Sequence, residues 1–300
     1  MTETASLPVI PDSRRDDLHQ LENIQLSQLN LFMAGNQFMV MQELVSAFKQ
    51  VYPEIQYIYY QTLPPGIQLK QILAGGANFR GARIDAAADI YTSVSENAMV
   101  RLADAQKIAP GSHRLYLHNR LTLLIPSANP ASITTVSDLG SDHVRISQPD
   151  PANEDIALHI INMYRDAGGD ALVHRIMEEK RAEGTTIMTV VHHRETPLRL
   201  QKGSVDVGPV WATEAAYARF RNLPVDVIDP GPDLDQRYGV NYYICKLRQA
   251  PNPQHAEHFL AFIASDRGRA IYEKHGFITP GSQTGDLLPG GLNEKIPSGP

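Results

Sequence analysis

The most unusual polar segment of this chain is a pair of histidines followed by an arginine, His192, His193 and Arg194. It lies between an apolar run that predicts a strand and Pro197, a residue type that is common in the first turn of helices. The Arg194 guanidinium can hold an oxyanion or carboxylate through two parallel hydrogen bonds, and one imidazole can donate as well, more strongly as the pH falls. In the alternative interpretation this is a solvated loop in which Arg194 pairs with Glu195 or another acid.

Five further segments place small or polar residues where an expected strand ends and an expected helix begins. Such a junction offers backbone N–H groups without intrahelical acceptors and the positive end of a helix dipole, and both attract an anion. These segments are Gly35-Asn36-Gln37, Pro65-Gly66, Ser93-Ser95, Ala152-Asn153 and Trp211-Thr213. With the histidine–arginine segment they supply the candidate ligand-binding residues, which are Gly35, Asn36, Gln37, Pro65, Gly66, Ser93, Ser95, Asn153, His192, Arg194 and Trp211.

Each candidate also has a purely structural interpretation. Gly35 and the Pro65-Gly66 pair suit ordinary turns between a strand and a helix. Trp211, the single tryptophan, suits a buried core, although its indole N–H is a donor of the kind that an anion site uses. The residues that equally suit helix caps are Asn36, Ser93, Ser95 and Asn153.

The composition argues against several classes of partner. The chain of 300 residues has 27 basic and 33 acidic side chains, a net charge of −6, and no Lys/Arg cluster, which argues against nucleic acid or an anionic membrane as partner. No run approaches the roughly 18 apolar residues of a membrane span. Cys245, the single cysteine, lies in an apolar run and is expected to be a buried thiol, so neither an intrachain disulfide nor a thiolate metal cluster is expected.

The sequence also lacks the motifs of common enzymes and metal sites. It has no P-loop, no Gly-x-Ser-x-Gly elbow and no Rossmann glycine triplet. His192 and His193 are adjacent, so on a strand they would point to opposite faces and could not easily share a metal ion. We therefore predict no catalytic residue, no metal site and no cofactor. An enzyme built on the same fold is kept as an alternative.

The elements that must position these residues alternate between strands and helices. Apolar runs predict strands, and between most of them apolar residues recur at helical spacing. The expected strands are 29–34, 55–62, 88–92, 121–125, 144–147, 187–191, 205–208, 225–228 and 238–247. Serial strand–helix units favour an α/β fold with mostly parallel sheets.

The order of these elements indicates a discontinuous organisation with two lobes. We expect a first lobe, a second lobe, two hinge strands that connect them, and a flexible segment at each end. In that order the residues are 29–118 plus 248–280, 126–236, 119–125 and 237–247, and 1–28 and 281–300. Two lobes joined by two strands can close over a ligand.

Several segments spread over residues 29–280 are similar to those of a known family. They are Ala34-Gly35-Asn36-Gln37, Ala88-Asp89-Ile90-Tyr91-Thr92-Ser93, Asp138-Leu139 with 144–151, Gly203 through Trp211, and 261–268 with His275-Gly276-Phe277. In order and spacing they resemble the periplasmic type II binding proteins, most closely the molybdate-binding branch. That branch usually has serines in the first loop, where this chain has Gly35-Asn36-Gln37, and a tyrosine in place of Trp211. The resemblance implies two Rossmann-like lobes joined by two hinge strands.

The resemblance further implies binding without catalysis, followed by hinge closure and ABC-type uptake through a permease. The expected solute is a small anion, either an oxyanion such as molybdate or tungstate, or a small carboxylate or phosphonate. A ligand-sensing subunit that passes closure to a regulatory partner is the other alternative, and a monomer is expected in either role. The family is periplasmic, but residues 1–28 lack the apolar core of a secretory signal, so the sequence as it stands predicts a cytoplasmic protein unless an export signal was removed.

Replacing Arg194 with alanine tests the first of these hypotheses. We expect Arg194→Ala to weaken ligand binding at least tenfold, about 1.4 kcal/mol, because the bidentate contact is lost. The melting temperature should stay close to that of the parent, since a loop arginine contributes little to the core. Titration calorimetry and thermal unfolding measure the two effects, and equal affinities would remove Arg194 from the site.

Overall fold

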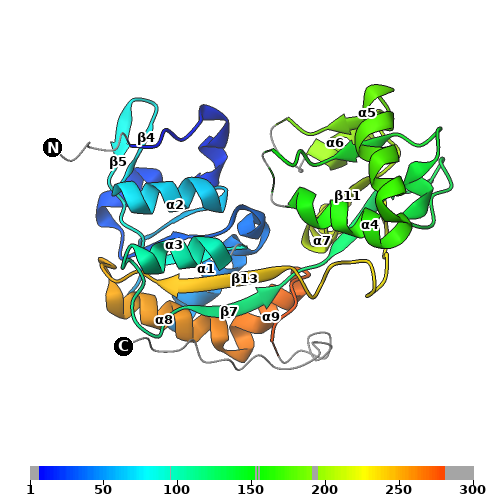
Figure 1. The fold of residues 1–300 in the computed structure, drawn as a ribbon. Coiled ribbons are helices and arrows are strands. Elements are labelled where there is room, and N and C mark those ends of the chain that lie inside the picture. Colours follow the sequence, from blue (N-terminus) through cyan, green and yellow to red (C-terminus); the bar gives the residue numbers. More distant parts are fainter. Residues whose placement is uncertain (1–6, 95, 153, 155, 191–194, 281–300) are drawn as a thin grey trace, which may run out of the picture.

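Two lobes lie side by side, each built from β-strands and helices (Figure 1). The structure is a computed structural model that describes residues 7–94, 96–152, 154, 156–190 and 195–280. An α/β architecture with two lobes was expected from the alternation of strands and helices. The two lobes differ in how their strands pair.

The first lobe is built around a six-stranded sheet in the order β1-β3-β2-β6-β13-β7. Its strands are β1 (Leu18–His19), β2 (Leu29–Phe32), β3 (Ile58–Gln61), β6 (Ile90–Ser93), β7 (Arg114–His118) and β13 (Asn241–Lys246). The central strands β2, β3 and β6 are parallel, and each leads into a helix. These helices are α1 (Phe38–Val51), α2 (Pro65–Ala74) and α3 (Glu96–Asp104). The three strand–helix units predicted from the sequence are confirmed.

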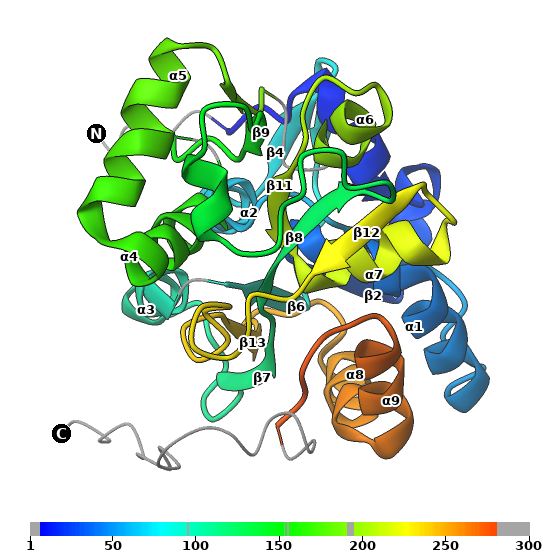
Figure 2. The same cartoon turned by 90° about the vertical axis from the view of Figure 1, so that its right-hand side faces the viewer.

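Helices cover both faces of this sheet, and each face has its own apolar core. On one face α1 packs with α8 (Pro253–Ala264) and α9 (Asp266–Lys274), which lie together in Figure 2. On the other face α2 and α3 pack with the hairpin of β4 (Ala77–Phe79) and β5 (Ala82–Ile84). The first of these cores continues into the second lobe, so the two lobes share apolar packing at their junction.

The second lobe has its own strands and helices. The strands are β8 (Leu121–Pro126), β9 (Ile146–Gln148), β10 (Thr186–Met188), β11 (Gly208–Trp211) and β12 (Val225–Ile228). Strand β8 pairs with β11 and β12, and β9 pairs with β10. The helical segments are η4 (Ser137–Gly140), α4 (Ile156–His174), η5 (Arg175–Glu179), α5 (Lys180–Ala182), α6 (Glu195–Gln201) and α7 (Ala212–Phe220). Segment α4 has non-helical backbone at Gly168 and Gly169.

One strand of this lobe is displaced along the chain from its predicted position. The sequence predicts a strand at 205–208, whereas β11 begins at Gly208 and runs to Trp211. Before Gly208, Val207 makes a single bridge with Ile146. The ladder begins at Gly208 because that is where the backbone comes alongside β8, with Gly208 opposite Leu124. The alternating valines that suggested the earlier strand are buried in the core rather than paired in this ladder.

Residues 7–28 are packed against the first lobe, which differs from the expected loose arm. The segment contains η1 (Asp12–Asp17), β1 and η2 (Leu21–Leu26). Strand β1 pairs antiparallel with β3 at the sheet edge. Ile10 is 1% exposed, and its backbone N–H donates to the carbonyl of Asn78 at 2.8 Å. A strand of two residues carries no periodicity, so the sequence offered no signal for this packing.

The chain passes between the sheets twice, at residues 119–120 and at residues 229–240. The predicted hinge strands 119–125 and 237–247 overlap these segments, but β8 lies wholly in the second lobe's sheet and β13 in the first lobe's sheet. The two crossing segments are bound to each other. The Leu121 N–H donates to the Asp235 carbonyl at 2.8 Å, and Arg120 pairs with Asp229 at 2.7 Å.

Two further sequence predictions concern single features of the chain. Cys245 is buried in β13, as predicted, and burial raises the pKa of its thiol to about 12. Among the helices in the part of the chain that the structure describes, none is both long and apolar enough to cross a membrane.

The packing of residues 7–28 can be tested with two neighbouring side chains. Ile10→Ala should lower the free energy of unfolding by about 2–5 kcal/mol, because it leaves a cavity in the core. Val9→Ala is the matched control: Val9 is 69% exposed, so its truncation should change stability by less than about 0.5 kcal/mol. Urea unfolding measures both. Equal, small effects would show that this segment is not part of the cooperative fold.

Candidate functional site

The parallel strands of the first lobe end at the edge from which the chain crosses to the second lobe. Ser93, the last residue of β6, lies opposite Tyr243 in β13, and His118, the last residue of β7, lies opposite Asn241. The loops that follow β2, β3 and β6 therefore lie next to the crossing segments. Ligands of open α/β sheets bind beyond such carboxyl ends of strands.

The loops after β2 and β3 touch each other through Gly35. A Cβ atom at Gly35 would lie 3.1 Å from the Thr62 carbonyl oxygen, so a side chain would push the two loops apart. Thr62 is held from the other side, because its N–H donates to the Asp17 carbonyl at 2.9 Å. The N-terminal segment 7–28 thus supports one of the two loops, and Gly35 brings them together.

Gln37 is fully buried and holds the first loop in place. Its amide oxygen accepts hydrogen bonds from the hydroxyls of Tyr116, at 2.8 Å, and Tyr272, at 3.2 Å. Its amide nitrogen donates to Thr92 Oγ1 at 3.1 Å. Thr92 Oγ1 also accepts a hydrogen bond from the Ala34 N–H at 2.7 Å. This network fixes the backbone of η3 (Gly35–Gln37), where α1 begins.

Asn36 belongs to a buried chain of side chains that reaches the second lobe. Its amide nitrogen donates to the Tyr242 hydroxyl, which also accepts from the Asn119 amide at 3.2 Å. The second hydrogen of the Asn119 amide is donated to Thr213 Oγ1 at 3.1 Å. Thr213 lies in the first turn of α7, the helix that begins directly after Trp211. Two predicted site segments, one in each lobe, are therefore connected.

The second loop opens α2 with Pro65 and Gly66. The Pro65 carbonyl accepts a hydrogen bond from the Tyr91 hydroxyl at 3.0 Å, which anchors the start of the helix. Gly66 is exposed, and no atom lies within 4 Å of where its Cβ would be. Pro65 has no N–H, and the Ile67 N–H donates to the Pro64 carbonyl at 2.9 Å. The Gly66 N–H is therefore the donor that the start of α2 presents beside open space.

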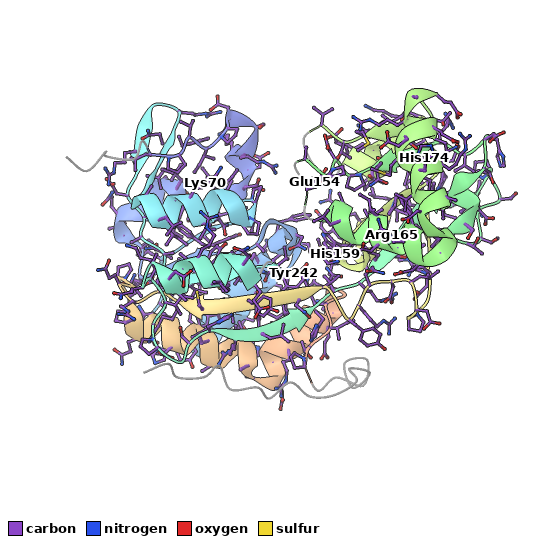
Figure 3. All side chains as sticks on the ribbon, viewed as in Figure 1. Lys70, Glu154, His159, Arg165, His174 and Tyr242 are labelled. Carbon is purple, nitrogen blue, oxygen red and sulfur yellow. The ribbon has the colours of Figure 1, made fainter. Side chains whose placement is uncertain are left out.

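On the second lobe, Trp211 lies between the end of β11 and the start of α7. Its side chain is 2% exposed, and its ring centroid lies 5.7 Å from that of His159 in α4. Burial lowers the pKa of His159, so its imidazole stays neutral at pH 7. Figure 3 shows His159 and Glu154 on the side of the second lobe that faces the first, with Tyr242 at the base between the lobes.

Carboxylates also occur along this edge of the second lobe. Glu154 accepts a hydrogen bond from the Thr189 hydroxyl. Glu195 accepts from the Val190 N–H at 2.8 Å and from Arg199 at 2.9 Å. These hydrogen bonds stabilise the negative charges of the two carboxylates in part. Within the described residues, no group of three or more His, Cys, Asp and Glu side chains could hold a metal ion.

The structure brings some predicted site residues together and leaves others outside its description. Gly35, Asn36, Gln37, Pro65, Gly66 and Ser93 lie at one edge of the first lobe, and Trp211 lies in the second lobe. Ser95, Asn153, His192 and Arg194 lie outside the described residues, as does His193. Sequence reasoning missed Tyr242 and Asn119, whereas Thr213 lies in the predicted segment Trp211-Thr213. An asparagine at the first crossing and a tyrosine just after the second were the available signal.

Most of the chain is similar to a known protein family. Residues 29–278 match the family model for bacterial extracellular solute-binding proteins. The chain belongs to this family. The matched region contains the strands of both lobes except β1, and both crossing segments, so the packed segment 7–28 lies outside it.

The relatives of this solute-binding protein are distant in sequence. The putative ABC transporter substrate-binding lipoprotein YvgL of Bacillus subtilis is 22% identical over 198 residues, which are 64% of this chain and 68% of YvgL. The periplasmic molybdate-binding protein of Azotobacter vinelandii superposes with a TM-score of 0.66 at 16% identity, covering 84% of this chain and 99% of that one. The sulfate-binding protein SubI of Mycobacterium tuberculosis gives 0.65 at 16% identity, covering 87% and 90%. The type II binding-protein fold inferred from the sequence is confirmed.

Two glycines of the site provide a matched pair of stability measurements. Gly35→Ala should destabilise the protein by about 1–3 kcal/mol, because the new Cβ meets the Thr62 carbonyl. Gly66→Ala should leave stability unchanged or raise it by up to about 1 kcal/mol, because alanine favours the helix and has free space. Chemical denaturation compares them. Equal losses at both positions would contradict the contact between the two loops.

Proposed function

We propose that this protein binds a small oxyanion between its two lobes, closes over it and presents it to an ABC permease, without altering it chemically. The observation that carries the proposal is that helix starts from both lobes meet at the crossing segments. The loop before α1 and the start of α7 are joined there by the chain from Asn36 to Thr213. The start of α2 lies beside the first of these, because the Thr62 carbonyl packs against Gly35.

The physical driving force in the proposal is a set of backbone donors, to which the predicted Arg194 guanidinium adds one positive charge. Each helix start stabilises a nearby anion by about 0.3–1 kcal/mol when exposed, and by up to about 2 kcal/mol when partly buried. When several helix starts are directed at one ion, the effect of their dipoles adds to that of the hydrogen bonds from their N–H groups. The net charge of −6 repels anions at long range, so attraction must come from these short-range donors.

The side chains divide into two roles in this proposal. The backbone N–H groups of Asn36 and Gly66 offer donors in the first lobe. The first turn of α7 offers donors in the second lobe after Ala212, whose own N–H already donates to the Arg120 carbonyl at 2.8 Å. Ser93 closes the site from β6, while Gln37 supports the loop rather than the solute, because its amide already makes three hydrogen bonds. The further predicted donors from the sequence are Ser95, Asn153, His192, Arg194 and the Trp211 indole.

The relatives support both the class of solute and the transport role. Two proteins with this fold are described as binding molybdate and sulfate, and a sequence relative is described as an ABC transporter substrate-binding lipoprotein. Closure would bend the two crossing segments, 119–120 and 229–240, since these are the only described stretches of chain that link the two lobes.

A thermal-shift screen followed by calorimetry tests the proposal. The panel is molybdate, tungstate, sulfate, phosphate, a small carboxylate and a phosphonate, each compared with sodium chloride of equal ionic strength. A solute at about 100 times its Kd should add about 2.7 kcal/mol to the free energy of unfolding. We expect at least one oxyanion to do so and to change the emission of Trp211, the single tryptophan.

Two results would contradict the proposal. If no member of the panel stabilises the protein beyond the chloride control, the solute is not a small oxyanion, carboxylate or phosphonate. If mass spectrometry shows a bound solute chemically altered after incubation, the protein is an enzyme. A solute recovered unchanged supports binding alone.

A further inference from the structure

A buried hydrogen-bond chain links the loop before α1 in the first lobe to the start of α7 in the second. It runs from Asn36 through the Tyr242 hydroxyl and the Asn119 amide to Thr213. Tyr242, Asn119 and Thr213 are 0% exposed, and Asn36 is 8% exposed. Asn119 lies at the first crossing between the lobes, so the chain passes through one of the two places where closure must bend the backbone.

The orientation of Asn119 is set by its neighbours. Its side-chain oxygen accepts from the Arg120 N–H at 2.9 Å, which leaves the amide nitrogen to face Thr213 and Tyr242. The nitrogen has two hydrogens, and each has one acceptor. Rotating the amide would break all three contacts at once. The Asn119 side chain therefore fixes the spacing between Thr213 in α7 and Tyr242 in β13.

Tyr242 is equally constrained. Its ring packs edge-to-face against Phe277, with centroids 5.6 Å apart, and burial raises the pKa of its hydroxyl well above the usual range. The hydroxyl therefore stays protonated and accepts the two amide donors. In a buried site of low dielectric, removing one member leaves another polar atom unsatisfied, at a cost of about 1–3 kcal/mol.

We propose that Tyr242 and Asn119 are positioning residues that couple the two halves of the solute site, so that a change at the start of α7 is transmitted to the loop at Gly35–Gln37. This inference rests on the proposed function for the identity of the two halves. The coupling itself is a property of the solute-free protein, because all four side chains are already connected in it.

A solute-free experiment measures the coupling directly. Thr213→Val removes the acceptor in the second lobe. We expect amide hydrogen exchange at residues 35–37 of the first lobe to become at least threefold faster, as well as exchange at the start of α7. In the Tyr242→Phe protein the chain is already broken, so adding Thr213→Val should leave exchange at 35–37 where Tyr242→Phe alone has set it.

Tyr164→Phe provides the matched control. Tyr164 is also fully buried, and its hydroxyl makes one hydrogen bond of 2.7 Å, to Gln148, within the second lobe. Removing this hydroxyl should speed exchange near β9 and α4 and leave residues 35–37 at the parent rate. The control separates coupling between the lobes from a general loss of stability.

The solute-bound experiment uses molybdate as the probe. Asn36→Ala and Thr213→Val interrupt the same chain, so their combined effect on the Kd should be at least threefold smaller than the product of the single effects. In the Tyr242→Phe protein the two effects should multiply. Titration calorimetry on the eight combinations of these three substitutions gives the comparison.

The outcomes separate this inference from the proposed function. If Thr213→Val leaves exchange at 35–37 unchanged, or changes it equally with and without the Tyr242 hydroxyl, the coupling is refuted whatever the protein binds. If the parent does not bind molybdate but the exchange result is as expected, the coupling stands and only the choice of solute fails. If molybdate binds and the effects multiply in every background, the chain does not act on binding.

Discussion

The relative placement of the two lobes depends on hydrogen bonds between buried side chains, which are not accessible to water. Apart from apolar packing at their base, the sheets are linked by two short crossings, and the Asn119 amide lies where these crossings meet β13 and α7. A buried amide with all its partners rigidifies a junction, whereas one with a missing partner destabilises it. The Arg120–Asp229 pair supports the same crossing from outside, but as an exposed ion pair it contributes little.

In the proposed function, this constraint would hold a donor-lined site in place before the solute binds. A helix start is effective only if it is directed at the ion before binding, because reorienting it would cost part of the binding energy. In the first lobe, Gln37 fixes one loop, and Gly35 lets the next loop approach it. In the second lobe, the position of α7 is fixed through Thr213. The polar side chains at this edge thus serve mainly to hold backbone donors in place.

Periodicity in the sequence predicted most elements but few of the contacts between them. The strand–helix units of both lobes follow from apolar spacing, and β12 occupies the predicted residues 225–228. The displaced start of β11 and the two-residue strand β1 depend on which backbone lies alongside, which spacing does not reveal. Tyr242 was interpreted as one apolar residue of a strand. Its partners Asn36 and Asn119 are 206 and 123 residues away in the chain, so no local pattern connects them.

The same reasoning explains why the fold is recognisable at 16% identity while the solute is not encoded in a motif. Backbone N–H groups are present in every sequence that forms a strand–helix junction, so the geometry survives when side chains change. Discrimination between oxyanions of similar size must then come from the few side chains that reach the junction. In the first lobe Asn36 is one of two amides at this junction, and its side chain is held by the Tyr242 hydroxyl. In the proposed function, a substitution at Tyr242, far from the loop in sequence, would therefore change the position of Asn36 in the solute site.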